Sequence, residues 1–212
     1  MTKSNFRQWI STLIRNALIL CFLTSSLPAF TEECDEYIGA GILPYVVLDD
    51  GSINVLLAHE QGRGWSSFGG GPKMLAPGKG VQSRCETRRE TAIREAIEES
   101  RRVLSRQVLA SAMKTAAIYP KQYGRRDFLT YVVAIPPTDI SHFTSNTVPA
   151  HDPGYHETNA LGWVALDELL RLVKANQNEA VIPSINNAGL YRHFHRGLRD
   201  ELKTGDVKLF KP

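Results

Sequence analysis

The feature that most constrains the fold of this 212-residue chain is the segment from Glu86 to Leu104, which has the pattern of an amphipathic helix. At about 100° per residue, a helix brings residues three and four apart onto one face. One face carries mainly polar side chains: Arg88, Thr91, Glu95, Glu98, Glu99 and Arg102. The opposite face carries the residues expected in the core: Ile93, Ala96, Ile97, Ser100 and Leu104. We therefore expect a helix from near Ser83 to about Leu109.

Three carboxylates on the polar face, those of Glu95, Glu98 and Glu99, have the i, i+3 and i+4 spacing that brings side chains together. Like charges at this spacing repel each other, and a bound cation would relieve the repulsion. Carboxylate oxygens suit Mg²⁺ or Mn²⁺. The alternative is an ordinary solvated surface, with i,i+4 pairs such as Glu90 with Arg94.

The spacing of Gly80, Glu86 and the run Arg94 to Glu99 resembles the Nudix box. The resemblance extends to the glycine-rich Phe68–Gly71 segment and to Asn159–Leu170, and it covers about residues 37 to 174. Two positions differ from the box, because Arg101 and Arg102 stand where glycine and an aliphatic residue are usual. This difference favours a helix that continues past Glu99. Residues 72–83 look like an insertion.

The resemblance implies an enzyme that uses Mg²⁺ or Mn²⁺ and water to cleave the diphosphate linkage of a nucleoside diphosphate joined to a group X. It implies that Glu95, Glu98 and Glu99 bind the metal, and that Arg94 and Glu86 orient these carboxylates. Glu157, in the long loop that follows Pro136, is the candidate general base, with a solvated loop acid as the alternative. A Nudix-like module that binds a nucleotide or pyrophosphate without cleaving it is the alternative function.

Several cations are candidates for binding substrate phosphates, although each taken singly could be a solvated surface charge. They are Arg88, Arg102, Lys121, Arg125 and Arg126. Two aromatic residues, Trp65 and Tyr123, could stack on a base, with packing as the alternative role.

Residues 1–29 have the layout of a secretory signal. They hold Lys3, Arg7 and Arg15 and no acidic residue, and a short apolar run precedes a candidate cleavage site after Ala29. The alternatives are an uncleaved anchor and an ordinary amphipathic helix, but the apolar run is shorter than the roughly 20 residues that span a bilayer, which disfavours the anchor. We therefore expect export to the periplasm or the medium, without a permanent membrane anchor.

Residues 1–29 also account for the net positive charge of the chain. The whole chain has a formal charge of +3, and residues 1–29 hold three basic residues and no acidic one, so the remainder is neutral. A nucleic-acid partner is therefore not expected. In an exported protein, Cys34 and Cys85 could form one disulfide, but the sequence does not place them within bridging distance.

The rest of the sequence alternates strand and helix patterns over residues 30–212, which are expected to form a single domain. A hairpin is expected over residues 37–60, with Pro44 at an edge or a bulge. Further strands are expected at 116–119, 128–135 and 161–164, and further helices at 166–174 and 185–202. The expected fold is α/β (α+β), a Nudix-like α/β/α sandwich with a mixed sheet between helices.

Overall fold

The computed structural model describes residues 34, 36–77, 82–174, 182, 184–185, 189–191, 194, 196–199 and 209–210. They belong to one compact unit that begins at Cys34. The expected signal segment, Gly80 and much of the expected helix 185–202 lie outside the described residues. No helix in the described part of the chain has the length and hydropathy to cross a bilayer.

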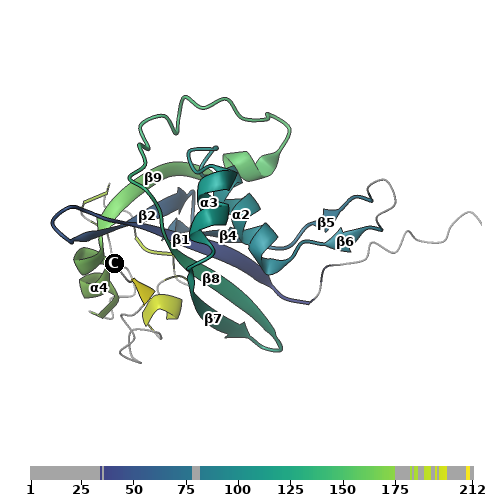
Figure 1. Ribbon diagram of the computed structural model, residues 1–212, viewed down its shortest axis with the longest axis horizontal. Helices are drawn as coiled ribbons and strands as arrows, with labels where there is room; N and C mark the ends of the chain where they lie inside the picture. Colours follow the sequence, from purple (N-terminus) through teal and green to yellow (C-terminus); the bar gives the residue numbers. More distant parts are fainter. Residues whose placement is uncertain are drawn as a thin grey trace, which may run out of the picture. The chain divides into compact units, whose positions relative to one another are not determined.

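A seven-stranded mixed sheet forms the centre of the described residues (Figure 1). Its main path runs β3 (Gly64–Ser66), β2 (Ile53–Glu60), β1 (Gly39–Val47), β8 (Arg126–Ala134), β7 (Ala117–Tyr123). β4 (Phe68–Gly70) pairs with β1, and β9 (Thr158–Ala165) pairs with β2. β1 and β8 are parallel, whereas the other pairs are antiparallel. The expected mixed sheet and the hairpin of β1 and β2 are confirmed.

The expectation that Pro44 marks an edge or a bulge was wrong, since β1 is a central strand. On one side β1 pairs with β8 from Gly39 to Tyr45. On the other side it pairs first with β4, up to Ile42, and then with β2, from Tyr45 onward. Pro44 lies between these two partners, where a residue without an N–H group is tolerated.

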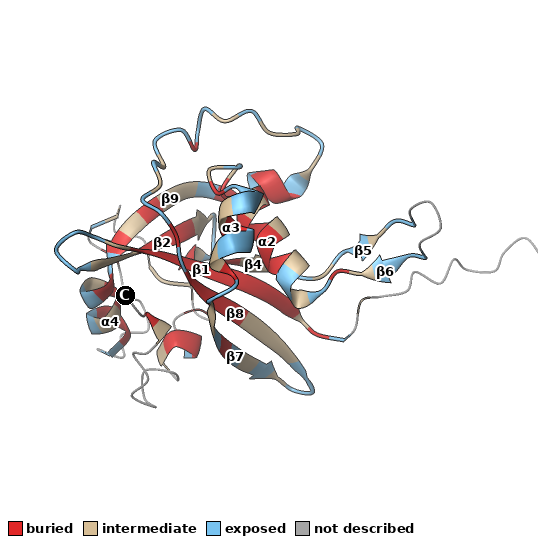
Figure 2. Cartoon of the chain, in the orientation of Figure 1, coloured by how far each residue is buried: buried red, intermediate tan, exposed pale blue. Residues whose placement is uncertain are grey.

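Two hydrophobic cores lie on opposite faces of the sheet, because successive strand residues point to opposite sides. On β2, Val55 and Leu57 join the core that contains α4 (Leu166–Lys174). Leu56 and Ala58 join the core that contains α2 (Arg88–Glu99) and α3 (Arg106–Ala112). The sheet therefore lies between helices, as expected, and its central strands are buried (Figure 2).

The prediction of one helix from Ser83 to Leu109 was wrong. α2 begins after a capping box formed by Thr87 and Glu90, and it ends at Glu99. Arg101 and Arg102 then adopt left-handed backbone angles, with φ of 48° and 66°. Such angles are uncommon for residues other than glycine, so the sequence pattern favoured a continuous helix. The separate helix α3 starts after Ser105.

Two shorter elements lie near α2. The segment read as an insertion, residues 72–83, holds β5 (Met74–Leu75), which forms a small hairpin with β6 (Arg84–Cys85) directly after it. The long loop after β8 contains the 3₁₀ helix η1 (Pro153–His156). β9 then leads directly into α4, which has the predicted bounds.

Candidate metal and substrate site

The three carboxylates of α2 are buried. Relative exposure is 8% for Glu95, 6% for Glu98 and 2% for Glu99. The alternative of a solvated acidic surface is therefore wrong for this face. Main chain packs directly against two of the carboxylates: a Cβ atom on Gly154 would lie 2.7 Å from Oε2 of Glu98, and one on Gly70 would collide with the carboxylate of Glu95. β4 and η1 thus enclose the acidic face of α2.

Arg94 lies at the centre of this acidic cluster. Its Nε donates to Oε1 of Glu86 at 2.8 Å, and its Nη1 lies 2.8 Å from Oε1 of Glu95 and 2.9 Å from Oε2 of Glu98. Its Nη2 donates to the carbonyl oxygen of Gly71 at 2.7 Å. These charge-assisted contacts fix the guanidinium and, through it, two of the proposed metal-binding carboxylates. Arg94 therefore links Glu86 to Glu95 and Glu98.

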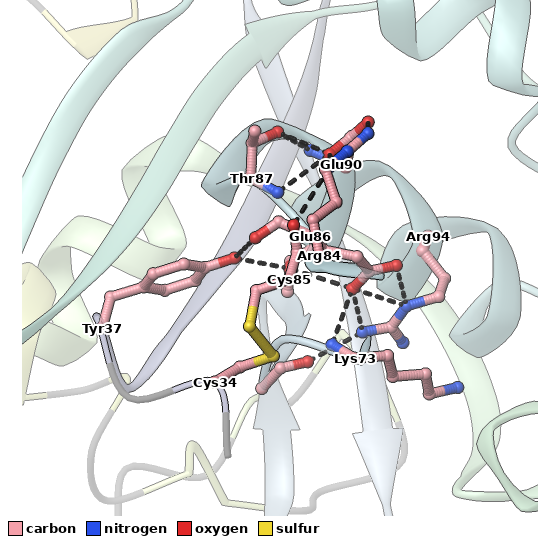
Figure 3. Close-up of a disulfide and its surroundings, with 11 residues drawn as sticks. Cys34, Tyr37, Lys73, Arg84, Cys85, Glu86, Thr87, Glu90 and Arg94 are labelled. Atoms are coloured by element: carbon pink, nitrogen blue, oxygen red, sulfur yellow. Dashed lines mark hydrogen bonds and ion pairs between the residues drawn. A yellow bond between two sulfur atoms is a disulfide. The ribbon is translucent and has the colours of Figure 1, made fainter. Parts of the chain in front are cut away.

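Glu86 is held from several directions (Figure 3). Its carboxylate accepts hydrogen bonds from the backbone N–H of Lys73 at 3.0 Å and from the Thr91 hydroxyl at 3.0 Å. Its own N–H donates to the carbonyl oxygen of Lys73 at 3.0 Å. The neighbouring Cys85 forms a disulfide with Cys34, with a Cα–Cα distance of 5.6 Å. The sequence did not decide whether Cys34 and Cys85 are joined, and in the structure they form a disulfide. This disulfide lies beside Glu86, which contacts Arg94.

Burial and charge act differently on the carboxyl groups. Burial raises the pKa of Glu95, and it raises the pKa of Glu99 well above its usual range, with the charges of Glu95 and Glu60 adding to the effect. Burial also acts to raise the pKa of Glu86, but the hydrogen bonds from Arg94 and from the N–H of Lys73 outweigh it, so that pKa is lowered. Glu86 is therefore stabilised as a carboxylate by the protein itself, whereas Glu99 lacks comparable compensation.

The donor chemistry suits a hard divalent cation, because the cluster supplies buried carboxylate oxygens that repel one another. Among the described residues, however, no three His, Cys, Asp or Glu side chains are already arranged around one point as metal ligands. Lys73 Nζ lies 3.2 Å from each oxygen of Glu98, and Arg94 contacts the same carboxylate. A metal ion would therefore have to exchange with at least one of these contacts.

A pocket of about 330 Å³ adjoins the acidic cluster. The two are joined at Gly69, which lines the pocket and whose N–H donates to Oε2 of Glu99 at 3.2 Å. Among the described residues, the lining of the pocket has five aromatic and three charged side chains. The aromatic residues are Tyr119, Tyr123, Phe128, Tyr191 and Phe194, and the charged ones are Glu60, Arg63 and Lys121. This combination suits a ligand with both a ring and a phosphate group.

The predicted phosphate-binding cations do not gather at one place. Lys121 lines the pocket. Arg125, in the turn between β7 and β8, and Arg126, the first residue of β8, are exposed and do not line it. Arg88 pairs with Asp127 at 2.7 Å, and the guanidinium of Arg102 lies 5.4 Å from the Tyr155 ring centre.

The two aromatic candidates also differ. Tyr123 lines the pocket, whereas Trp65 is only 1% exposed and belongs to the core next to α4. The packing alternative therefore holds for Trp65.

Two charged residues near the site had not been singled out from the sequence. Glu60 lines the pocket, pairs with Arg63 at 2.7 Å, and is close enough for its charge to act on Glu99. A change of register between His59 and Glu60 interrupts the pairing of β2 with β9 at this point. Lys73, the residue before β5, contacts Glu98. Neither Glu60 nor Lys73 belongs to a sequence motif, so their position near α2 follows only from the fold.

No protein-family model matches the sequence, and the comparison with curated proteins found no match. Solved structures with a related arrangement include an Ap4A hydrolase from C. elegans, at 15% identity over 82% of this chain and 99% of that one, with a TM-score of 0.42. They also include RenU, a Nudix hydrolase from M. smegmatis, at 19% identity over 80% and 88%, with a TM-score of 0.40. The MutT protein from Methanosarcina mazei Go1 has 15% identity over 82% and 96%, with a TM-score of 0.38. Similarity of this degree does not assign an activity to the chain.

Proposed function

We propose that this protein is a Nudix-type hydrolase that requires Mg²⁺ or Mn²⁺ and cleaves the diphosphate linkage of a nucleoside diphosphate joined to a group X. The observation that carries the proposal is the burial of Glu95, Glu98 and Glu99 on one helix face beside an aromatic, cation-lined pocket. Buried carboxylates that lack sufficient counter-charge are costly to keep ionised, and such groups recur at functional sites.

The proposed division of labour follows from the contacts. Glu95, Glu98 and Glu99 would hold the metal, which when bound neutralises diphosphate charge and lowers the pKa of water. Arg94 keeps the carboxylates of Glu95 and Glu98 in place through its direct contacts. Glu86 keeps Arg94 in place.

Two carboxylates outside α2 are candidates for the general base. Glu157 is exposed at the end of η1, and its charge contributes to the raised pKa of Glu99. The charge of Glu60 also raises the pKa of Glu99, and Glu60 lines the pocket. A general base must reach the attacking water. Replacing Glu157 and Glu60 with glutamine, one at a time, tests which of the two has this role.

The pocket supports a nucleotide-like substrate. Its aromatic walls offer surfaces for a base, and Lys121 offers a positive charge for a phosphate oxygen. The reacting diphosphate would then lie near Gly69, where the pocket meets Glu99. We propose no identity for X.

We also propose that the protein is exported after cleavage near Ala29. Structural disulfides persist mainly in oxidising compartments, so the Cys34–Cys85 disulfide supports export. The measurement is the intact mass of protein recovered from the periplasm or medium. A mature chain beginning near Phe30 is expected, and an exported chain that retains residue 1 would contradict the proposed cleavage.

The decisive experiment is a screen of purified protein with Mg²⁺ or Mn²⁺ against nucleoside diphosphate sugars, dinucleoside polyphosphates, ADP-ribose and nucleoside triphosphates. Product masses locate the broken bond. We expect Glu98→Gln and Glu99→Gln to lower turnover at least about 100-fold while the protein stays folded, and Glu36→Gln, at an exposed position, to leave turnover unchanged. Nucleotide binding without turnover in the unaltered protein would instead support the non-catalytic module. Full activity in both site variants would reject the assigned site.

A further inference from the structure

Lys73 has a fixed backbone and a side chain that reaches into the acidic cluster. The backbone is held by the two reciprocal hydrogen bonds with Glu86, each 3.0 Å long. The next residue, Met74, pairs with Cys85, which the disulfide ties to Cys34. In Figure 3 the Lys73 side chain extends on the side of Arg94, away from the disulfide. The ammonium group therefore has a defined anchor point and a limited reach.

The ammonium group of Lys73 contacts both oxygens of Glu98, each at 3.2 Å. The Glu98 side chain is 8% exposed, whereas that of Lys73 is 50% exposed. Arg94, the other cation on Glu98, is only 13% exposed and has further contacts with Glu86, Glu95 and Gly71. Of these two cations, Lys73 is therefore the one that can leave Glu98 at a smaller cost.

We propose that Lys73 is an exchangeable counter-ion of the site, which pairs with Glu98 before a divalent metal binds and with a phosphate oxygen of the substrate afterwards. This inference rests on the proposed function. A divalent ion bound to Glu98 would repel the nearby ammonium group, and a diphosphate on that ion would attract it. Because the Lys73 backbone is anchored, the released ammonium group stays close to the metal-bound anion. Lys73 thus couples metal binding to substrate binding.

The coupling gives two measurable expectations for Lys73→Met, which removes the charge and keeps most of the side chain's length. Without a diphosphate, Mn²⁺ should bind at least about fivefold more tightly than in the unaltered protein, because a competing cation is gone. Methylenediphosphonate, a diphosphate analogue that water does not cleave at its P–C–P bridge, should increase Mn²⁺ affinity in the unaltered protein. In Lys73→Met this increase should fall at least about fivefold.

Calorimetric titration of the full-length protein with Mn²⁺, with and without methylenediphosphonate, tests both expectations without relying on activity. Lys73→Arg keeps the charge and should retain most of the coupling. Lys114→Met removes the charge of an exposed lysine on the segment after α3 and should change neither affinity. Lys73→Gln provides a second neutral variant, and circular dichroism checks that each variant is folded.

The inference is overturned if Lys73→Met and Lys73→Gln bind Mn²⁺ as the unaltered protein does, or if methylenediphosphonate increases Mn²⁺ affinity equally in all of them. Failure of the proposed function itself gives a different result: the unaltered protein would not bind Mn²⁺ at all, with or without methylenediphosphonate.

Discussion

Gly154 lies so close to Glu98 that a Cβ atom on this glycine would be 2.7 Å from Oε2 of the carboxylate. The two residues are far apart in the sequence, one on η1 and the other on α2. Their contact means that the long loop after β8 forms part of the wall around the acidic cluster. The position of the Glu98 side chain therefore depends on where this loop packs.

Gly154→Ala should displace the Glu98 carboxylate, because the neighbouring atom is at the end of a side chain that can rotate away. We expect hydrolysis to fall about 10-fold or more. Stability should fall by no more than about 1 kcal/mol. Steady-state kinetics and urea unfolding measure the two effects.

The matched control is Gly51→Ala in the turn between β1 and β2. Gly51 has φ of 81° and open space around it, so alanine there should reduce stability through backbone strain and leave hydrolysis unchanged. Equal losses of activity in Gly154→Ala and Gly51→Ala would show that the Gly154 effect is general destabilisation.

Arg101 compensates for its unfavourable backbone conformation with contacts to the long loop. Its side chain donates to the carbonyl oxygens of Tyr155 at 3.2 Å and Thr158 at 3.3 Å, and it lies 4.6 Å from the Phe143 ring centre. We expect Arg101→Gly to lower the unfolding free energy by about 1–2 kcal/mol despite relieving the φ strain. For a chain of this size, this corresponds to a fall in Tm of roughly 2–8 °C.

Arg102→Gly is the matched comparison, because Arg102 also has a positive φ. Its side chain is exposed, and its hydrogen bond to the Tyr155 hydroxyl is long, at 3.5 Å. Its guanidinium lies 5.4 Å from the Tyr155 ring centre, farther than that of Arg101 from the Phe143 ring, so its contacts are weaker. Removing the strain should therefore raise or preserve Tm. Thermal unfolding of both variants tests the difference, and a higher Tm for Arg101→Gly than for the unaltered protein would refute the compensating role of its contacts.

The Cys34–Cys85 disulfide should stabilise both the fold and the brace around Glu86. It closes a segment with a sequence separation of 51 residues, and its removal should cost about 2–4 kcal/mol. The double variant Cys34→Ser with Cys85→Ser should also show weaker metal binding, because β6 would no longer be tied in place beside Glu86. Urea unfolding with and without dithiothreitol measures the first effect. If dithiothreitol lowers the stability of the double variant as much as that of the unaltered protein, the loss does not come from this disulfide.

Glu90 should give stability that is lost in acid. Its hydrogen bond with Arg84 and its position in the capping box hold its pKa at about 2, below the usual value of 4.5. The folded state thus binds this proton more weakly than the unfolded state does. The contribution is fully present above about pH 4.5 and is lost as the pH falls towards 2.

Urea unfolding of Glu90→Gln and the unaltered protein between pH 6 and pH 3 tests this dependence. The variant should be less stable at pH 6, and the difference should shrink as the pH falls. Solvent screening limits the size of this stability difference, since the Glu90 side chain is 39% exposed. A difference that stays constant over this range would argue against the ionised carboxylate as its source.

Much of the fold was predictable because it follows from local periodicity. Alternation along β1 and β2 sets which side chains enter each core, and the strand-to-helix transition at Leu166 was placed correctly. The end of α2 was not predictable in this way. Arg101 favours a continued helix locally, and its contacts with Tyr155, Thr158 and Phe143 offset the left-handed backbone.

The sequence by itself determined that Glu95, Glu98 and Glu99 lie on one face of a helix, since helical periodicity depends only on neighbouring residues. The tertiary structure decided that this face is buried, that Lys73 neutralises part of it, and that Cys34 bridges to Cys85. These contacts join segments whose separation depends on sheet pairing and loop packing. No local pattern specifies such distances, and the proposed chemistry depends on them.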